Sequence, residues 1–265
     1  MSVKDAVLRI IRRKSFQPFW ERLHHYTRIG QNYWSSTVDE SGELYALDFA
    51  RTQLRADGTA IVVDVGANAG QFAMAAAERL KPAHIYSFEP SRKTFELLQA
   101  AISTAALQAV IHPQPCALSD REEQAVLYSS QHGAAIASLY NLHNPPSEFK
   151  PEFSETVTTM TLDGFCAEHD IEHIDYLKID VEGHEFSVLR GAQRMLSEQR
   201  IRFIQFEFGE ANIDSRTYMR DFFELLTPDF EFYRIVSNGL RKVPAYHADL
   251  EVFATINYLA VRRSQ

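Results

Sequence analysis

The chain has 265 residues, a formal net charge of −8 and 45% hydrophobic residues. This length is typical of one large α/β domain with a short extension, and the acidic balance argues against nucleic acid as a substrate, because phosphate binding requires a basic surface. No apolar run approaches the roughly 20 residues that cross a bilayer, so we expect no transmembrane segment.

Two parts are predicted along the chain, a helical extension over residues 1–41 and a main domain over residues 42–265. In the extension, the apolar residues between Ala6 and Ile11 share one helical face, and arginines surround the other. This pattern is found in helices that lie on a membrane surface and in solvated helices that pack on a domain. We favour packing, with the extension forming a cap beside a ligand site.

The N-terminus and the cysteines favour a cytoplasmic location. The first residues carry charges within their apolar run and lack a small-residue cleavage site, unlike a signal peptide. Cys116 and Cys166 lie in different segments without a C-x-x-C spacing, so neither a disulfide framework nor a zinc site is expected. Two reduced thiols are typical of a cytoplasmic protein.

The segment Ile61–Gly70 reads I-V-V-D-V-G-A-N-A-G, an apolar run that ends in glycines. It predicts a buried parallel strand and a tight turn, and the alanine-rich segment Gln71–Leu80 predicts the following helix. Strand, glycine turn and helix form the ligand-binding start of a doubly wound α/β fold. A second strand, His84–Phe88, ends at Glu89, whose carboxylate can accept hydrogen bonds from two ribose hydroxyls of a nucleotide.

The charge at this turn separates two cofactor classes. A dinucleotide site needs G-x-G-x-x-G, whereas here Gly66 and Gly70 are accompanied by Asn68 and Gln71 where further glycines would stand. Asp64, two residues before the first glycine, would repel a pyrophosphate but suits a cation. S-adenosylmethionine carries an ammonium and a sulfonium, so the turn favours this cofactor over NAD.

With these motifs, the sequence resembles the FkbM family of S-adenosylmethionine-dependent methyltransferases from about Gly42 to Val261. The resemblance rests on the segments Val63–Gly70, Ser87–Ser91, Ala117–Asp120, Leu177–Glu185 (L-K-I-D-V-E-G-H-E) and Val188–Ala192. It implies a Rossmann-like class I methyltransferase fold, α/β, with a seven-stranded, mostly parallel sheet and an antiparallel hairpin at one edge. It also implies O-methylation of a hydroxyl group on a sugar, a glycan or a polyketide-like natural product.

The motifs and the resemblance together predict a cofactor site. Its expected residues are Asp64, Gly66, Asn68, Gly70, Glu89, Pro90, Ala117 and Asp180. The resemblance puts Ala117 at the adenine ring. The glycine- and proline-containing loop His132–Pro151 is long, and long loops in compact domains are usually functional or mobile, so we expect it and the N-terminal segment to contact the acceptor.

A cluster of acids marks the predicted reaction site. Asp180 follows the predicted strand Ile174–Ile179, and Glu182, His184 and Glu185 come within six positions. The carboxyl end of this strand is where a doubly wound fold places a second ligand. An acceptor hydroxyl must lose its proton, so Asp180, Glu182 and His184 are the candidate catalytic residues. Asp180 is the first choice, and His184 is the group whose ordinary pKa lies nearest neutrality.

The same acids permit other roles. Asp180 with Glu207 or Glu210 from the next strand could hold Mg²⁺, as in some O-methyltransferases with this fold, because hard cations prefer oxygen ligands. Alternatively, these glutamates face solvent or bond to backbone, Lys178 pairs with Glu185 in an ordinary ion pair, and Glu182 caps the following helix.

Two competing functions are an NAD-type Rossmann oxidoreductase and a catalytically silent module that binds a cofactor or a glycan. The first would need the absent glycines, and the second would lack a base. The expected partner is a small molecule or glycan that offers a hydroxyl group. A homo-oligomer stays open, and the sequence does not identify the acceptor.

Overall fold

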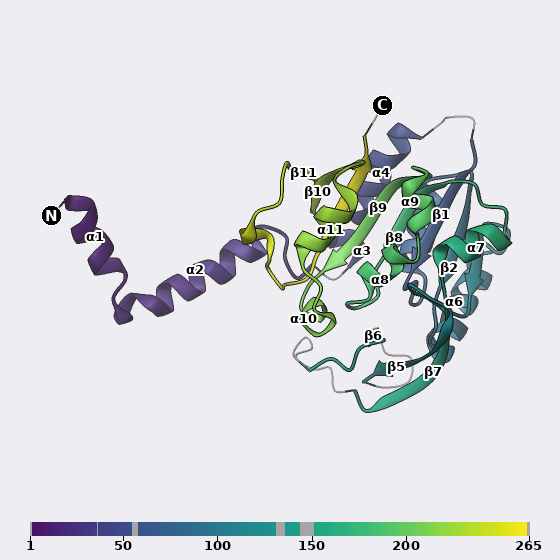
Figure 1. The fold of residues 1–265 in the computed structure, drawn as a ribbon, viewed down its shortest axis with the longest axis horizontal. Coiled ribbons are helices and arrows are strands. Elements are labelled where there is room, and N and C mark those ends of the chain that lie inside the picture. Colours follow the sequence, from purple (N-terminus) through teal and green to yellow (C-terminus); the bar gives the residue numbers. More distant parts are fainter. Residues whose placement is uncertain (1, 36, 55–57, 131–135, 144–150, 264–265) are drawn as a thin grey trace.

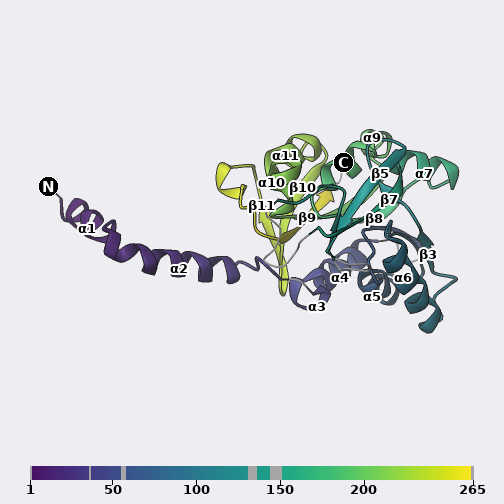
Figure 2. The ribbon, with the colours of Figure 1, turned by 90° about the horizontal axis from the view of Figure 1, so that it is seen from below.

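The computed structural model contains a twisted eight-stranded sheet with helices on both faces, a smaller four-stranded sheet, and a helical arm that projects from the domain (Figures 1 and 2). The residues that the structure describes are 2–35, 37–54, 58–130, 136–143 and 151–263. Among these residues, no helix is both long enough and apolar enough to cross a membrane.

The large sheet has the strand order β11-β10-β12-β9-β8-β1-β2-β3. Its strands are β1 Ala60–Val65, β2 Ala83–Phe88, β3 Ile111–Gln114, β8 Ile174–Ile179, β9 Ile201–Phe208, β10 Phe230–Val236, β11 Gly239–Val243 and β12 Ile256–Arg262. The five strands from β3 to β9 run parallel, and β12 lies antiparallel between β9 and β10. Because the chain order reverses between β1 and β8, the carboxyl ends of these two strands form the ligand-binding switch point of a doubly wound sheet.

The predicted parallel sheet with an antiparallel edge hairpin is confirmed, and one strand is added. The strand expected at Ile174–Ile179 has the expected bounds. The eighth strand, β11, pairs only with β10 among the described strands, through the turn before Gly239. Its five residues, G-L-R-K-V, show no alternation of apolar and polar side chains that would mark a strand in the sequence.

Helices cover both faces of this sheet, with α4, α5 and α6 on one face and α7, α8, α9 and α11 on the other (Figure 2). Their bounds are α3 Val38–Ser41, α4 Glu43–Gln53, α5 Gln71–Arg79, α6 Arg92–Thr104, α7 Leu162–Glu168, α8 Glu185–Arg190, α9 Gln193–Ser197, α10 Ala211–Ser215, α11 Met219–Leu226 and the 3₁₀ turn η2 Ala248–Leu250. Two separate helices, α8 and α9, follow one another closely after β8. The break falls at Gly191, where a Cβ atom would lie 2.0 Å from the carbonyl oxygen of Ser119, so the chain passes too close to that loop for a continuous helix.

The smaller sheet has the order β4-β7-β5-β6. Its strands are β4 Ala117–Leu118, β5 Glu123–Ser129, β6 Ala137–Ser138 and β7 Phe153–Met160. The short strand β4, directly after Cys116, pairs with β7. This pairing fixes the position of Ala117 against the ends of the large sheet.

The N-terminal extension does not form the expected cap. Its elements, α1 Val3–Ile11, η1 Lys14–Phe16 and α2 Gln17–Ile29, extend away from both sheets (Figures 1 and 2). Only its last part reaches the domain, where Tyr33 is buried in the core and the Trp34 backbone N–H donates to the Thr255 carbonyl oxygen at 2.8 Å. The α2 helix buries no residue, so nothing holds it over the sheet.

Candidate active site

A cavity of about 480 Å³ opens at the carboxyl ends of β1, β2, β8 and β9 and is walled on one side by the smaller sheet. Nine residues singled out in the sequence line it, namely Gly66, Asn68, Glu89, Pro90, Ala117, Asp180, Glu182, His184 and Glu207. Asp64 and Gly70, which were also expected there, do not line it. The volume lies within the range of sites for small organic ligands.

The glycine turn after β1 is fixed by backbone contacts. The backbone N–H groups of Gly66 and Ala67 both donate to the carbonyl oxygen of Phe88, at 3.0 and 2.9 Å. Gly66 has φ +81°, and a Cβ atom there would lie 1.9 Å from the carbonyl oxygen of Asp180. Only glycine allows this conformation and this approach, so the turn rests directly on the backbone that follows β8.

Glu89 is tied to the same turn. One of its carboxylate oxygens accepts a hydrogen bond from the Asn68 backbone N–H at 3.0 Å, and the other accepts from the Ser91 N–H at 2.9 Å. Burial raises the pKa of Glu89 to about 7, although these two hydrogen bonds act in the opposite direction and lower the pKa. Each carboxylate oxygen can accept more than one hydrogen bond, so the group can still receive ribose hydroxyls from the cavity.

Asp64, expected at the mouth of the turn, is buried on the face of β1 that packs against helices. Its side chain shares that face with Val62, which packs in the core beneath α4 and α5. Neither carboxyl oxygen of Asp64 has a hydrogen-bond partner among the described residues, and burial raises its pKa to about 7. Asp64 is buried and does not line the cavity, and its neighbour across the sheet is Lys178.

Lys178 is the centre of a buried polar network. Its ammonium lies 2.9 Å from a carboxylate oxygen of Asp180 and 4.0 Å from one of Glu43. Glu43 in turn accepts hydrogen bonds from Gln205 at 2.6 Å and from the Ser41 hydroxyl at 2.9 Å. Burial alone would lower the pKa of Lys178, but the carboxylates of Asp180, Glu43 and Asp64 outweigh it and raise the pKa above its ordinary value. The lysine stays charged and orients the candidate base.

Glu185 holds the loop after β8 and does not pair with Lys178. Its carboxylate accepts from the backbone N–H groups of Val181 at 3.1 Å and Gly183 at 3.0 Å. The alternative ion pair between Lys178 and Glu185 is therefore wrong, and so is the cap by Glu182, because no side chain among the described residues caps α8. The backbone of Glu182 has φ +50°, a left-handed conformation that is uncommon for a residue other than glycine.

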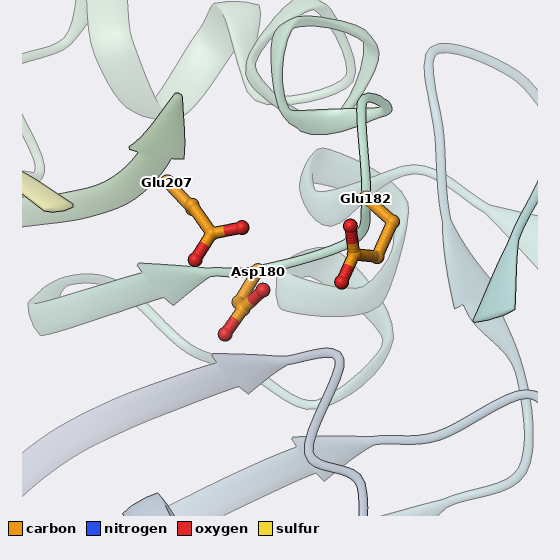
Figure 3. A group of neighbouring side chains, drawn as sticks. All are labelled: Asp180, Glu182 and Glu207. Carbon is orange, nitrogen blue, oxygen red and sulfur yellow. The ribbon is translucent and has the colours of Figure 1, made fainter. Parts of the chain in front are cut away.

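Three carboxylates from this loop and from β9 face one another (Figure 3). Ligand oxygens of Asp180, Glu182 and Glu207 all lie within 4.8 Å of one another. Burial, followed by the charge of Asp180, raises the pKa of Glu182 to about 8 and that of Glu207 well above its ordinary value. Such a group can share a proton or hold a hard divalent cation. Glu210, the alternative ligand, instead accepts from the Trp34 indole N–H at 2.9 Å.

His184 lines the cavity but does not titrate near neutrality. Burial lowers its pKa to about 4, which overturns the expectation drawn from its ordinary value. Its Nε2 atom lies 2.9 Å from the Ser119 hydroxyl, while Nδ1 is buried without a hydrogen-bond partner among the described residues. The neutral ring is suited to accept or donate one hydrogen bond, and in this cluster the pKa of Glu182, raised to about 8, lies nearer neutrality.

Comparison with known proteins assigns the family. Residues 64–234, more than half of the chain, match the model of the methyltransferase FkbM domain. The chain belongs to the FkbM methyltransferase family. These enzymes depend on S-adenosylmethionine, so the family favours methyl transfer over the oxidoreductase alternative.

The chain is also similar to a 2-O-methyltransferase and to two proteins of known structure. The 2-O-methyltransferase NoeI of Sinorhizobium fredii (strain NBRC 101917 / NGR234) is 25% identical over 191 residues, covering 68% of this chain and 76% of that protein. A solved FkbM methyltransferase from Methylobacillus flagellatus KT is 17% identical with a TM-score of 0.47, over 78% of this chain but only 45% of that longer chain. The N-terminal domain of human METTL16 in complex with SAH is 10% identical with a TM-score of 0.46, over 84% and 69% of the two chains.

The FkbM domain also contains cavity residues that the sequence did not single out. Apolar side chains from the smaller sheet and from the residues that flank β6 line the cavity, namely Leu118, Leu127, Ile136 and Leu139, and Trp34 and Thr255 line it as well. Of the loop His132–Pro151, expected to contact the acceptor, residues 132–135 and 144–150 lie outside the described residues, and Ile136, Ala137 and Leu139 line the cavity. Only the pairing of β5 with β7 could have pointed to these residues, because this pairing places Leu127 in the cavity wall.

Proposed function

We propose that this FkbM enzyme transfers the methyl group of S-adenosylmethionine to a hydroxyl group of a sugar, a glycan or a polyketide-like acceptor. The observation that carries the proposal is the position of Asp180 in the cavity wall, 2.9 Å from the buried Lys178 and beside two further carboxylates. The name of the relative NoeI, a 2-O-methyltransferase, supports a hydroxyl as the methylated group.

The chain offers a suitable set of groups for the cofactor. Glu89 and the turn at Gly66 and Asn68 would hold the ribose, and Ala117 with the apolar side chains of Phe88 and Leu118 would hold the adenine. The buried carboxylates are compatible with a cationic ligand. S-adenosylmethionine supplies an electrophilic methyl group with a good leaving group already attached, so the protein's part is to position the acceptor, exclude water and accept a proton.

Asp180 is the group proposed to accept that proton. It is the member of the carboxylate cluster in direct contact with a cation, and this contact holds its side chain in one orientation. Glu182 and Glu207, with raised pKa values, would be protonated for part of the time at neutral pH and can donate hydrogen bonds to an oxygen of the acceptor. An alternative within the same proposal is a divalent cation held by Asp180, Glu182 and Glu207, which would lower the pKa of the bound hydroxyl instead.

The test is methyl transfer from labelled S-adenosylmethionine to a panel of sugars, oligosaccharides and polyketide alcohols. Asp180→Asn should lower turnover by about 10²–10⁴-fold while affinity for S-adenosylhomocysteine changes little. Asp48→Asn on the exposed side of α4 is the matched control and should behave as the natural chain.

Each assay is repeated with a chelator and with added Mg²⁺. Activity that disappears with the chelator and returns with Mg²⁺ supports the divalent cation, and activity that persists supports proton transfer to Asp180 alone. Near-normal turnover of Asp180→Asn under both conditions would remove this residue from the reaction. Cofactor binding without transfer to any acceptor, or to amines only, would contradict the proposed function.

A further inference from the structure

The N-terminal arm, defined here as residues 2–30, presents an apolar surface that the described domain leaves uncovered. The arm extends away from both sheets (Figures 1 and 2). No residue of η1 or α2 is buried, and the side chains of Phe19 and Tyr26 are 56% and 68% exposed. Exposed large apolar residues are normally scattered singly over a protein surface. A contiguous set of them on one helix therefore indicates an interaction site.

The exposed apolar residues of the arm fall on one side of each helix. Phe19, Leu23 and Tyr26 are spaced by four and three positions along one face of α2, and Phe16, three positions before Phe19, immediately precedes this helix. The indole N–H of Trp20, on the same side, donates to the carbonyl oxygen at the end of α1 at 2.8 Å and joins the two helices.

Helix α1 also exposes apolar residues on one side, and its other side is basic. Val7 and Ile10, three positions apart, are both exposed, and Arg9, Arg12 and Arg13 lie around the rest of the helix and its end. An apolar stripe flanked by arginines is typical of helices that lie in the plane of a membrane surface.

The charges of the chain are divided between the arm and the domain. Residues 2–30 contain seven lysines and arginines and two acids, so their formal charge is +5, which leaves −13 on the remainder of a chain whose total is −8. A negatively charged surface therefore attracts the arm and repels the domain. Because the arm projects away from the domain, the arm can contact such a surface while the domain stays at a distance from it.

We propose that the arm docks this protein onto an anionic lipid bilayer. The apolar face of α2 enters the boundary between headgroups and acyl chains, where Tyr and Trp side chains are favoured, and the arginines of α1 contact lipid phosphates. The domain, with its acidic surface, stays in the water beside the membrane. This property is independent of the proposed methyl transfer.

A second copy of the chain is a poorer occupant of the same surface. The helices have nine and thirteen residues, short of the three to four heptads that a coiled coil between two arms requires. The exposed large apolar residues of the domain lie singly on separate elements, for example Leu97 on α6, Val126 on β5 and Ile213 on α10. In the part of the chain that the structure describes, they form no groove for a partner's arm.

The experiment is flotation of the full-length chain with vesicles of phosphatidylcholine alone and with vesicles containing about 30% phosphatidylglycerol. We expect the chain to bind the anionic vesicles. At roughly 0.5 M salt its affinity for them should fall by about tenfold or more, because surface charges are then screened. Phe19→Ser with Leu23→Ser, and separately Arg9→Glu with Arg12→Glu and Arg13→Glu, should each abolish binding.

Matched changes on the domain serve as controls. Leu97→Ser with Val126→Ser, and Arg241→Glu on β11, alter exposed side chains of the same types outside the arm and should leave flotation unchanged. Affinity for S-adenosylhomocysteine, measured for every variant, reports that the domain is folded. Absence of flotation, equal flotation with neutral vesicles, or a dimer in solution that the arm variants dissociate without any vesicle binding would overturn the proposal.

Discussion

The ammonium of Lys178 lies 2.9 Å from the carboxylate of Asp180, and both residues sit at the carboxyl end of β8. The lysine is buried, whereas the Asp180 side chain is 34% exposed toward the cavity. The pair therefore presents its negative member to the ligand and keeps its positive member in the core. With Glu43 behind it, the lysine is anchored from the side opposite the reaction site.

Replacing Lys178 by methionine should destabilise the protein and impair turnover together. The change leaves Asp180, Glu43 and Asp64 close to one another with no cation, and removing one partner of a buried pair costs about 3–5 kcal/mol. Chemical denaturation measures the free energy of unfolding. Lys242→Met, which removes a pair with Glu231 at the surface, is the matched control and should lower the free energy of unfolding far less, because exposed ion pairs contribute little. Equal losses in the two variants would contradict the central role of Lys178.

Glu89→Gln should weaken binding of S-adenosylhomocysteine by roughly 10–100-fold, because hydrogen bonds to a charged acceptor are worth about 1.5–3 kcal/mol. The glutamine keeps an acceptor oxygen for only one of the backbone N–H groups of Asn68 and Ser91, whereas Glu89→Ala removes both acceptors, so the turn should survive better in Glu89→Gln. Titration calorimetry gives the affinity, and thermal unfolding separates loss of binding from loss of fold. Unchanged affinity in both variants would exclude Glu89 from the cofactor site.

Gly66→Ala should destabilise the protein by on the order of 2–3 kcal/mol and abolish cofactor binding. The new Cβ atom would overlap the carbonyl oxygen of Asp180, and alanine is strained at φ +81°. Gly239→Ala is the matched control, because a Cβ atom there meets nothing within 4 Å. The melting temperatures of the two variants, with and without S-adenosylhomocysteine, test the difference. A Gly66→Ala protein that melts and binds as the control does would show that the close contact is unimportant.

Without cofactor, the protein should lose stability as the pH rises from about 6.5 to about 8. The folded-state pKa values of Asp64, Glu89 and Glu185 are raised to about 7 and that of Glu182 to about 8, from 3.8 or 4.5, so the folded state holds more protons than the unfolded state in this window. Their stabilising contribution is complete below pH 4 and is lost as the pH rises through 7 to 8.

The measurement is the melting temperature as a function of pH. It is confined to pH 6.5 and above because His184, with its pKa lowered to about 4, contributes in the opposite sense below its ordinary value of 6.5. Glu182→Gln should flatten the profile near pH 8, whereas Glu78→Gln at an exposed position of α5 should not. A profile that rises with pH over this range would contradict the raised pKa values.

The sequence predicts the scaffold well, because parallel strands are continuous apolar runs and the acids at their ends are easy to find. Glu89, Asp180 and Glu207 all end or follow such runs, and all three line the cavity. The direction of a single side chain depends on register and on the position of the helices, which the apolar run around Asp64 does not encode. The partner of Lys178 was missed for the same reason, since it is chosen by three-dimensional neighbours.

The arm and the smaller sheet show a different limit of sequence interpretation. An amphipathic pattern predicts that one face of a helix has an apolar neighbour, but it does not identify that neighbour. For α1 and α2 the pattern is therefore equally compatible with packing on the domain. The cavity wall built by Leu127 depends on pairing between β5 and β7, two strands separated by a long connection. Such non-local pairing leaves no pattern in either strand alone.

The contact between the Gly66 position and the carbonyl of Asp180 makes the two halves of the cavity a single mechanical unit. Backbone meets backbone there, with no side chain between them to absorb a displacement. A ligand that fixes the position of the turn after β1 must also fix the position of the peptide that carries Asp180. Cofactor and acceptor should therefore bind with positive cooperativity, and the coupling should act equally in both directions.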